Sequence, residues 1–169
     1  MKPSVTDAWT EIIFKENKFA DLRIYPNYLE MQFGYIVQLR QIELMQIQHN
    51  IDVTVKTDYV RNQSDPDNAR YVFAYTITIK NNGFASAQLL RRRWLITDAN
   101  DKIQEVQGDG VVGKQPHLQP GDTFTYTSAA MIETPFGYMQ GSYYLIADDG
   151  IEFDTEIPAF GLSIPHALH

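Results

Sequence analysis

The strongest constraint on this chain is an alternation of apolar and polar residues, with a period of two, between residues 51 and 160. In the segment 71–80, large apolar side chains occupy every second position, namely Tyr71, Phe73, Tyr75, Ile77 and Ile79. Alternation of this kind predicts strands with one buried face, because successive side chains of a strand point to opposite sides. The chain is therefore expected to fold as antiparallel sheets.

Turn residues divide this pattern into short strands. A strand over 51–56 and a polar stretch over 62–68 predict a hairpin with the segment 71–80. Further strands are expected over 88–97, 102–107, 123–128, 142–147 and 151–157, with turns at Asn81-Asn82-Gly83, 98–101, 119–121 and Asp149-Gly150. Asn and Gly at Asn81-Asn82-Gly83 suit the positive φ of a tight reversal. About seven short antiparallel strands predict an all-β sandwich of the immunoglobulin or fibronectin type III kind.

Residues 1–50 lack this alternation, and Met45 lies just before the first clear strand, so part of this segment is an N-terminal extension of the β domain. Apolar residues at 36, 39 and 42 fit a short helix, and Pro26 and Gly34 are expected to break a longer one. Two interpretations stay open for the extension. It is either an over-extended start of the sequence or an arm for dimer formation or for a partner.

Charge and composition exclude several classes of function. At 169 residues the chain can bury its own core, and the absence of cysteine excludes thiolate catalysis, cysteine-ligated zinc and disulfides. A formal net charge of −7 argues against nucleic acid as a partner. No apolar run reaches the ~18 residues of a membrane span, and acidic residues interrupt the N-terminal segment where a signal peptide is apolar. We expect a cytoplasmic protein without membrane insertion.

The segment Gly108–Gly113 matches the G-x-G-x-x-G pattern of dinucleotide-binding folds. That site requires a helix after the motif, and the prolines and the glycine between residues 116 and 121 exclude an ordinary helix there. A dinucleotide-binding fold is therefore not expected.

Two interpretations of this motif remain. In one, Gly108, Gly110 and Gly113 expose backbone N–H groups to an anion such as pyrophosphate, and Lys114 adds a positive charge. In the other, the glycines belong to a strand edge or a bulge.

Arg91, Arg92 and Arg93 form the only basic run of the chain. Within a strand, Arg91 and Arg93 share one face, whereas Arg92 shares the other face with Trp94. Arg91 and Arg93 are candidates for binding phosphate or an acidic partner, and the alternative is a solvated strand face. For Arg92 we expect a stem that crosses the rim of the sandwich or a pair with a carboxylate.

No catalytic group of residues and no metal site is predicted. The four histidines, which form no ligand pair on a helix, are His49, His117, His166 and His169. No serine lies in a nucleophile motif. Acidic residues gather at 65–67, 98–101 and 148–149, where turns favour them. The aromatic stretch Thr134–Tyr144 either fills the core at alternate positions or forms a binding patch beside the Gly108–Gly113 loop.

From Arg91 onward, distinctive short motifs follow one another in one register. They are Arg92-Arg93-Trp94, 105–113, Pro116, 118–121, Phe124, 126–128, 134–144, Phe153 and Ile157-Pro158-Ala159-Phe160. From about Ile47 to His169 the sequence closely resembles the bacterial ApaG family, also called CorD. Two features depart from the family pattern. The family begins near Met45, so the resemblance implies an ApaG domain over 45–169 and an N-terminal extension over 1–44 that lies outside it. In addition, Arg93 stands where the family has His.

The resemblance implies one fibronectin type III-like β-sandwich. It also implies an association with cobalt resistance and magnesium efflux, and a role as an interaction module, since the same domain recurs in eukaryotic F-box proteins and in a DNA polymerase delta-interacting protein. The leading hypothesis is a non-enzymatic sandwich that binds a protein partner or a small phosphorylated ligand and needs no cofactor. The alternative is a nucleotide- or pyrophosphate-binding enzyme that uses the Gly108–Gly113 loop. Homo-oligomer formation stays open.

Overall fold

A computed structural model describes residues 26–165, with side chains from Gly34 onward. The chain divides into two compact units, Met1–Leu44 and Met45–His169. All the strands of the described residues belong to the second unit. The expectations for His166 and His169, and for residues 1–25 of the extension, lie outside the described residues.

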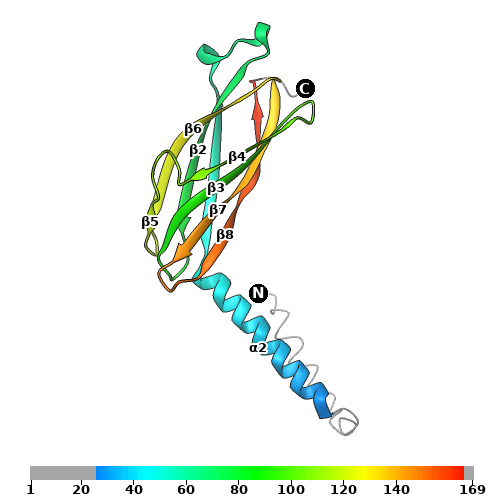
Figure 1. The fold of residues 1–169 in the computed structure, drawn as a ribbon, viewed down its shortest axis with the longest axis vertical. Helices are drawn as coiled ribbons and strands as arrows, with labels where there is room; N and C mark the ends of the chain where they lie inside the picture. Colours follow the sequence, from blue (N-terminus) through cyan, green and yellow to red (C-terminus); the bar gives the residue numbers. More distant parts are fainter. Residues whose placement is uncertain (1–25, 166–169) are drawn as a thin grey trace, which may run out of the picture. The chain divides into compact units, whose positions relative to one another are not determined.

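Two antiparallel sheets form a sandwich (Figure 1). The strands are β1 (Ile51–Tyr59), β2 (Tyr71–Asn81), β3 (Ala87–Asp98), β4 (Ile103–Asp109), β5 (His117–Leu118), β6 (Thr123–Ile132), β7 (Phe136–Ala147) and β8 (Glu152–Ser163). One sheet has the order β1-β2-β6, and the other has the order β4-β3-β7-β8 with β5 also paired to β3. The predicted all-β sandwich is confirmed. The additional strand, β5, has two residues, which is too short for alternation to reveal.

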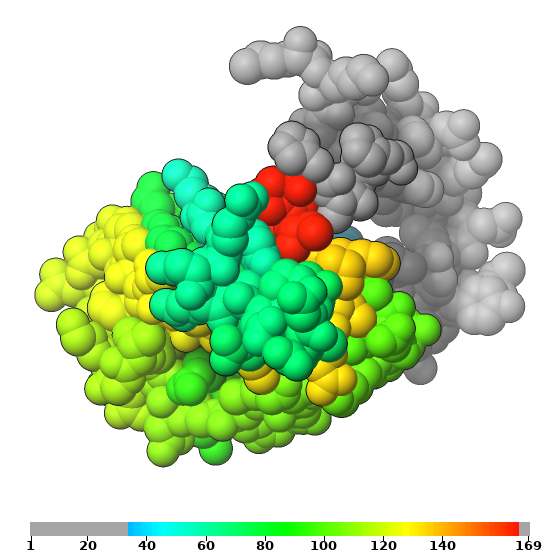
Figure 2. Space-filling view, turned by 90° about the horizontal axis from the view of Figure 1, so that it is seen from above, coloured from blue at the N-terminus to red at the C-terminus, as the bar shows by residue number. Residues whose placement is uncertain are grey.

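The predicted hairpin between the first two strands is confirmed. β1 and β2 pair without interruption from Ile51 opposite Asn81 to Tyr59 opposite Phe73. Their connection carries two short 3₁₀ helices, η2 (Arg61–Gln63) and η3 (Pro66–Asn68). Seen from above, this connection lies over the centre of one end of the sandwich (Figure 2).

The prediction of a tight reversal at Asn81-Asn82-Gly83 is wrong. β2 and β3 belong to different sheets, and none of these three residues has a positive φ. The side chain of Asn81 is fully buried. Its amide nitrogen donates to the carbonyl oxygens of Ala85 (2.8 Å) and Leu118 (2.9 Å), and its amide oxygen accepts from the Gly83 N–H (2.9 Å). Asn81 thus holds together the crossover between the sheets.

The last two strands are longer than predicted. β7 begins at Phe136 rather than at residue 142, and β8 continues past Pro158 to Ser163. The glycines of β7 concealed its first half, although Gly141 is required there: a Cβ would lie 2.1 Å from the Arg93 carbonyl oxygen. β8 accommodates Pro158 because it is an edge strand and its register with β7 shifts at this point.

The helix α2 spans Pro26–Gln48, so the prediction that Pro26 and Gly34 break a longer helix is wrong. Pro26 occupies the first helical position, where the missing N–H would have no intrahelical partner. Gly34 lowers helix stability by about 1 kcal/mol relative to alanine without ending the helix. No helix of the described residues has both the length and the apolar character needed to cross a membrane.

An aromatic cluster around Trp94 joins the two sheets. The indole lies edge-on to the rings of Tyr75, Tyr143 and Phe160, with centroid distances of 5.5, 6.4 and 5.8 Å. Beside it, the hydroxyl oxygens of Tyr126 and Tyr143 are 2.6 Å apart, in a buried hydrogen bond between the sheets. Trp94 is therefore central to the core.

We expect Trp94→Ala to lower the free energy of unfolding by about 3–5 kcal/mol, because the cavity in this cluster cannot be refilled. Equilibrium denaturation in urea measures the change. Gln104→Ala, at an exposed position of β4, is the control and should stay within about 0.5 kcal/mol of the native protein. An unchanged denaturation midpoint for Trp94→Ala would contradict its central position.

The buried tyrosine pair predicts a loss of stability in alkali. Burial raises the pKa of both Tyr126 and Tyr143 above its ordinary value. The unfolded chain therefore loses these protons first, and the free energy of unfolding should decrease as the pH rises above about 10. Urea denaturation at a series of alkaline pH values tests this. The double variant Tyr126→Phe, Tyr143→Phe should show a smaller decrease, and an equal decrease would refute the assignment.

Deletion of residues 1–44 should leave the sandwich folded. Every buried core residue of the described chain lies at or after Ile51, and residues 45–169 form a compact unit of their own. The truncated chain should unfold in urea in one cooperative transition with the midpoint of the full chain. Loss of cooperativity would show instead that the extension is part of the folding unit.

Candidate functional site

The outer face of the five-stranded sheet carries two of the three arginines. Arg91 and Arg93 are exposed on β3, whereas Trp94 is buried and Arg92 is half-buried, so the predicted assignment of faces is confirmed. The pairing of the strands places Arg93 between Gln107 of β4 and Ser142 of β7. A row of polar side chains thus crosses the sheet at Arg93.

A carboxylate fixes the orientation of Arg93. Its Nε donates to Oε1 of Glu105 on β4 at 2.8 Å, and the Gln107 side-chain amide donates to the same oxygen. The hydrogen bond from Arg93 is the main reason why the pKa of Glu105 lies below its ordinary value, and it raises the pKa of Arg93. Both groups therefore stay charged at neutral pH.

Arg91 occupies the next row of the same face. Its guanidinium carbon lies 4.3 Å from the centroid of the Tyr144 ring on β7, in a cation–π contact. The Tyr144 hydroxyl donates to Glu152 of β8, and this hydrogen bond raises the pKa of the phenol. Arg91 and Arg93 are thus both held by neighbouring strands.

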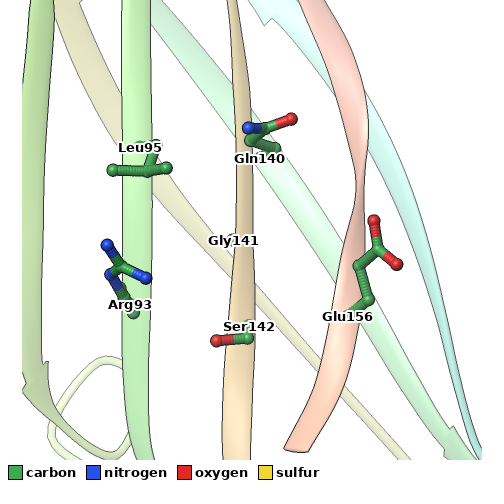
Figure 3. A pocket seen from close by; sticks show the side chains of 6 residues that line it. All are labelled: Arg93, Leu95, Gln140, Gly141, Ser142 and Glu156. Carbon is green, nitrogen blue, oxygen red and sulfur yellow. The ribbon is translucent and has the colours of Figure 1, made fainter.

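A shallow pocket of about 190 Å³ opens beside Arg93. Its lining consists of Arg93, Leu95, Gln140, Gly141, Ser142 and Glu156. The Ser142 hydroxyl points from β7 toward the strand that carries Arg93, and Glu156 lies on the other side of β7 (Figure 3). The register shift between β7 and β8 leaves Gln140 without a paired residue on β8, which leaves room for the pocket.

Arg92 does not contribute to this pocket. One of its terminal nitrogens donates to the carbonyl oxygens of Asp109 (3.0 Å) and Gly110 (2.7 Å). A Cβ on Gly108 would lie 3.1 Å from the same guanidinium, so the glycine makes room for it. Arg92 therefore bonds backbone carbonyls, not the carboxylate that was one of the two expectations for it.

The Gly108–Gly113 segment forms the end of β4 and a tight turn. The Gly110 N–H donates to the Leu90 carbonyl (2.8 Å), and Val111 and Lys114 exchange backbone hydrogen bonds of 2.8 and 2.9 Å. The central residues of this turn, Val112 and Gly113, both have positive φ, as a type I′ turn requires. The N–H groups of Gly110, Val111 and Lys114 are thus occupied by the protein itself.

The candidate residues therefore lie in two places. Arg91 and Arg93 are on the open sheet face, whereas Gly113 and Lys114 are in the turn after β4. The sequence interpretation missed Glu105, Gln140, Ser142 and Glu156 as neighbours of Arg93. Alternation gives the face of each residue, but only the strand order and the β7–β8 register bring these four together.

The carboxylates of two acidic turns bond the turn backbone, and Asp148 and Asp149 also pair with His117 and His49, each at 2.8 Å. The Asp98 carboxylate accepts from the N–H groups of Asn100 (2.8 Å) and Lys102 (3.0 Å), and Asp149 accepts from the Ile151 N–H (3.0 Å). This agrees with turn formation as the reason for acids at these places. Among the side chains that the structure describes, from residue 34 to residue 165, no three from His, Asp and Glu are grouped so that they could hold a metal ion.

The aromatic stretch supplies both core and surface. Met139 and Tyr143 are buried, whereas Phe136 and Tyr138 are exposed. Tyr138 pairs with Thr97, and Tyr144 pairs with Arg91 near the glycine segment. The exposed Phe136 and Tyr138 thus lie at the other end of β3 from the Gly108–Gly113 loop.

Comparison with known proteins identifies the family. Residues 61–147 match the ApaG domain. Over 121 residues the chain is 57% identical to Protein ApaG of Thiobacillus denitrificans, and the alignment covers 72% of this chain and 95% of the relative. It is 54% identical over 121 residues to Protein ApaG of Pseudomonas putida, with 72% and 96% covered.

Solved structures agree with the sequence relatives. The chain resembles the crystal structure of an ApaA protein from Bordetella pertussis with a TM-score of 0.69 and 46% identity, over 71% of this chain and 98% of that one. A second solved structure has a TM-score of 0.67 and 47% identity, over 70% and 90% of the two chains. On the domain match, the identity and the shared sandwich, this chain belongs to the ApaG family.

Proposed function

We propose that this protein is a non-enzymatic binding module that recognises an acidic group on the outer face of the five-stranded sheet. Arg93 is the principal contact and Arg91 the secondary one. The acidic group is a carboxylate of a protein partner or the phosphate of a small phosphorylated ligand. One observation carries the proposal: a guanidinium with a fixed orientation borders an open pocket that also contains neutral hydrogen-bond donors.

The chemistry of the pocket supports this choice. A guanidinium offers paired N–H groups that match a carboxylate or a phosphate, and Glu105 engages only Nε of Arg93. The Ser142 hydroxyl and the Gln140 amide add neutral donors in the same pocket. On the far wall, the Glu156 carboxylate offers acceptor oxygens to a ligand. A ligand that joins an acidic group to an N–H donor would therefore match both walls, and a peptide segment has this combination.

The link with cobalt resistance and magnesium efflux belongs to the same proposal. We assign it to the partner that the module binds. An ion site on the described surface would need several oxygen or imidazole ligands that converge. The turn carboxylates instead accept hydrogen bonds from their own backbone or pair singly with His49 and His117.

The glycine segment receives less support as an anion site. Each glycine has a structural reason: Gly108 makes room for Arg92, a Cβ on Gly110 would lie 2.1 Å from the Lys114 carbonyl oxygen, and Gly113 has a φ of +76°. A strand, β5, and not a helix follows the motif. We therefore do not propose the nucleotide- or pyrophosphate-binding enzyme as a second function.

Titration of the full chain with two probes, pyrophosphate and the dipeptide N-acetyl-aspartyl-glycine, tests the proposal. We expect NMR shifts at Arg93 and Ser142, and Arg93→Ala should weaken binding about tenfold, a loss of about 1.4 kcal/mol. Arg93→Lys should recover part of the affinity, because it keeps the charge and loses the planar fork. Lys56→Ala removes an exposed cation from the other sheet and should have no effect.

Variants of the turn locate the site independently. Lys114→Ala and Gly113→Val should leave probe binding unchanged. If these two weaken binding and Arg93→Ala does not, the anion site is the glycine loop and the sheet-face proposal is wrong. Absence of binding by both probes at millimolar concentration would also overturn it.

A further inference from the structure

β6 is an edge strand without the usual protection against further pairing. In its sheet it pairs only with β2, at ten consecutive positions from Thr123 to Ile132 and without a register shift. Its sequence, TFTYTSAAMI, has no charged residue, proline or glycine. Within the described chain, its backbone forms no hydrogen bond outside the β2 ladder. Half of its N–H and C=O groups therefore face outward.

The other edge strands of the described sandwich carry protective features. β1 contains Asp52, Lys56 and Asp58. β8 contains a proline, three acidic residues at its start and a register shift. β4 has only seven residues, including Glu105 and Asp109. Charges, proline, bulges and short length are the devices that keep sheet edges from pairing, and β6 has none of them.

A small hollow lies beside the second half of β6. β1 contacts β8 on one side of the sandwich, so β6 and β4 are the edges on the opposite side, and the hollow of about 90 Å³ lies between them. Ile96, Met131 and Ile132 supply its apolar lining. At its rim the Lys102 ammonium bonds the Glu133 carboxylate at 2.8 Å. The hollow has the size and chemistry for one apolar side chain.

We propose that the free edge of β6 binds an extended segment of a partner protein by strand addition, with one apolar side chain of that segment in the hollow. In strand addition, main-chain hydrogen bonds supply affinity and a side-chain pocket supplies selectivity. The inference goes beyond the proposed function, because it concerns the other sheet and does not use Arg91 or Arg93.

The charges at the two ends of β6 indicate which kind of partner segment can pair with it. β6 is uncharged, but Asp122 precedes it and Glu133 follows it, and the chain has a net charge of −7. A partner segment with an uncharged centre and basic ends complements this arrangement. A second copy does not: antiparallel pairing of two β6 strands along their full length would place Asp122 opposite Glu133 of the second copy at both ends, and like charges in opposed positions are destabilising.

The test uses the full chain and a synthetic peptide of alternating threonine and valine with lysine at each end. Amide hydrogen exchange followed by NMR should slow about tenfold at alternate residues of β6 when the peptide is added. The resonances of Met131 and Ile132 should shift. The double variant Thr125→Lys, Thr127→Lys should weaken peptide binding about tenfold, because lysine on an edge strand opposes strand addition.

Matched variants distinguish strand addition at β6 from peptide binding at another edge strand. Thr54→Lys lies in the same cross-strand row as Thr125 but on β1, and it should leave peptide binding unchanged, as should Arg93→Ala. The proposal is overturned if the β6 amides of the free protein are as protected as those of β2, or if the peptide protects β1 or β8 equally. It is also overturned if protection of β6 rises with protein concentration alone and sedimentation shows a dimer.

Discussion

The contact between Trp94 and Gly141 is the constraint on which the rest of the sandwich depends. The two residues pair directly across β3 and β7, and the indole lies so close that a Cβ on residue 141 would be 3.0 Å from its ring. The ring also contacts Tyr75 of the other sheet and Phe160 of β8. The buried indole N–H of Trp94 has no hydrogen-bond partner among the described residues. Leaving such a donor unpaired lowers the free energy of unfolding by about 1–3 kcal/mol.

The same contact connects the core to the candidate site. Arg93 precedes Trp94 and therefore points to the opposite face of β3, and its carbonyl oxygen is the atom that a Cβ on residue 141 would strike at 2.1 Å. A larger residue at 141 would push the strands apart and disturb both the aromatic cluster and the pocket. The position of Arg93 is thus fixed from inside by packing and from outside by Glu105.

Alternation of side chains predicted a large part of this arrangement. It gave the buried face of β2, the opposite directions of Arg93 and Trp94, and the hairpin of β1 and β2. It did not give the neighbours of Arg93, because these depend on which strands pair and on the shift between β7 and β8. The turn predicted at Asn81 was wrong for a different reason. Asparagine is common in tight turns, but here its buried side chain forms hydrogen bonds that hold the crossover between the sheets. The glycines of the G-x-G-x-x-G pattern each answer a separate steric need, which a motif search cannot distinguish from a ligand loop.

The contact of β1 with β8 places the first and last strands of the sandwich side by side. Contacts between residues so far apart in sequence are formed late and slowly, because the intervening chain must first lose the entropy of closing a long loop. During synthesis, β1 and β2 can pair early as a local hairpin, but Leu162, which is fully buried, joins the core only after β8 has been synthesised. The sandwich is therefore completed by its C-terminal strand, and until then the apolar faces of the earlier strands stay accessible to chaperones.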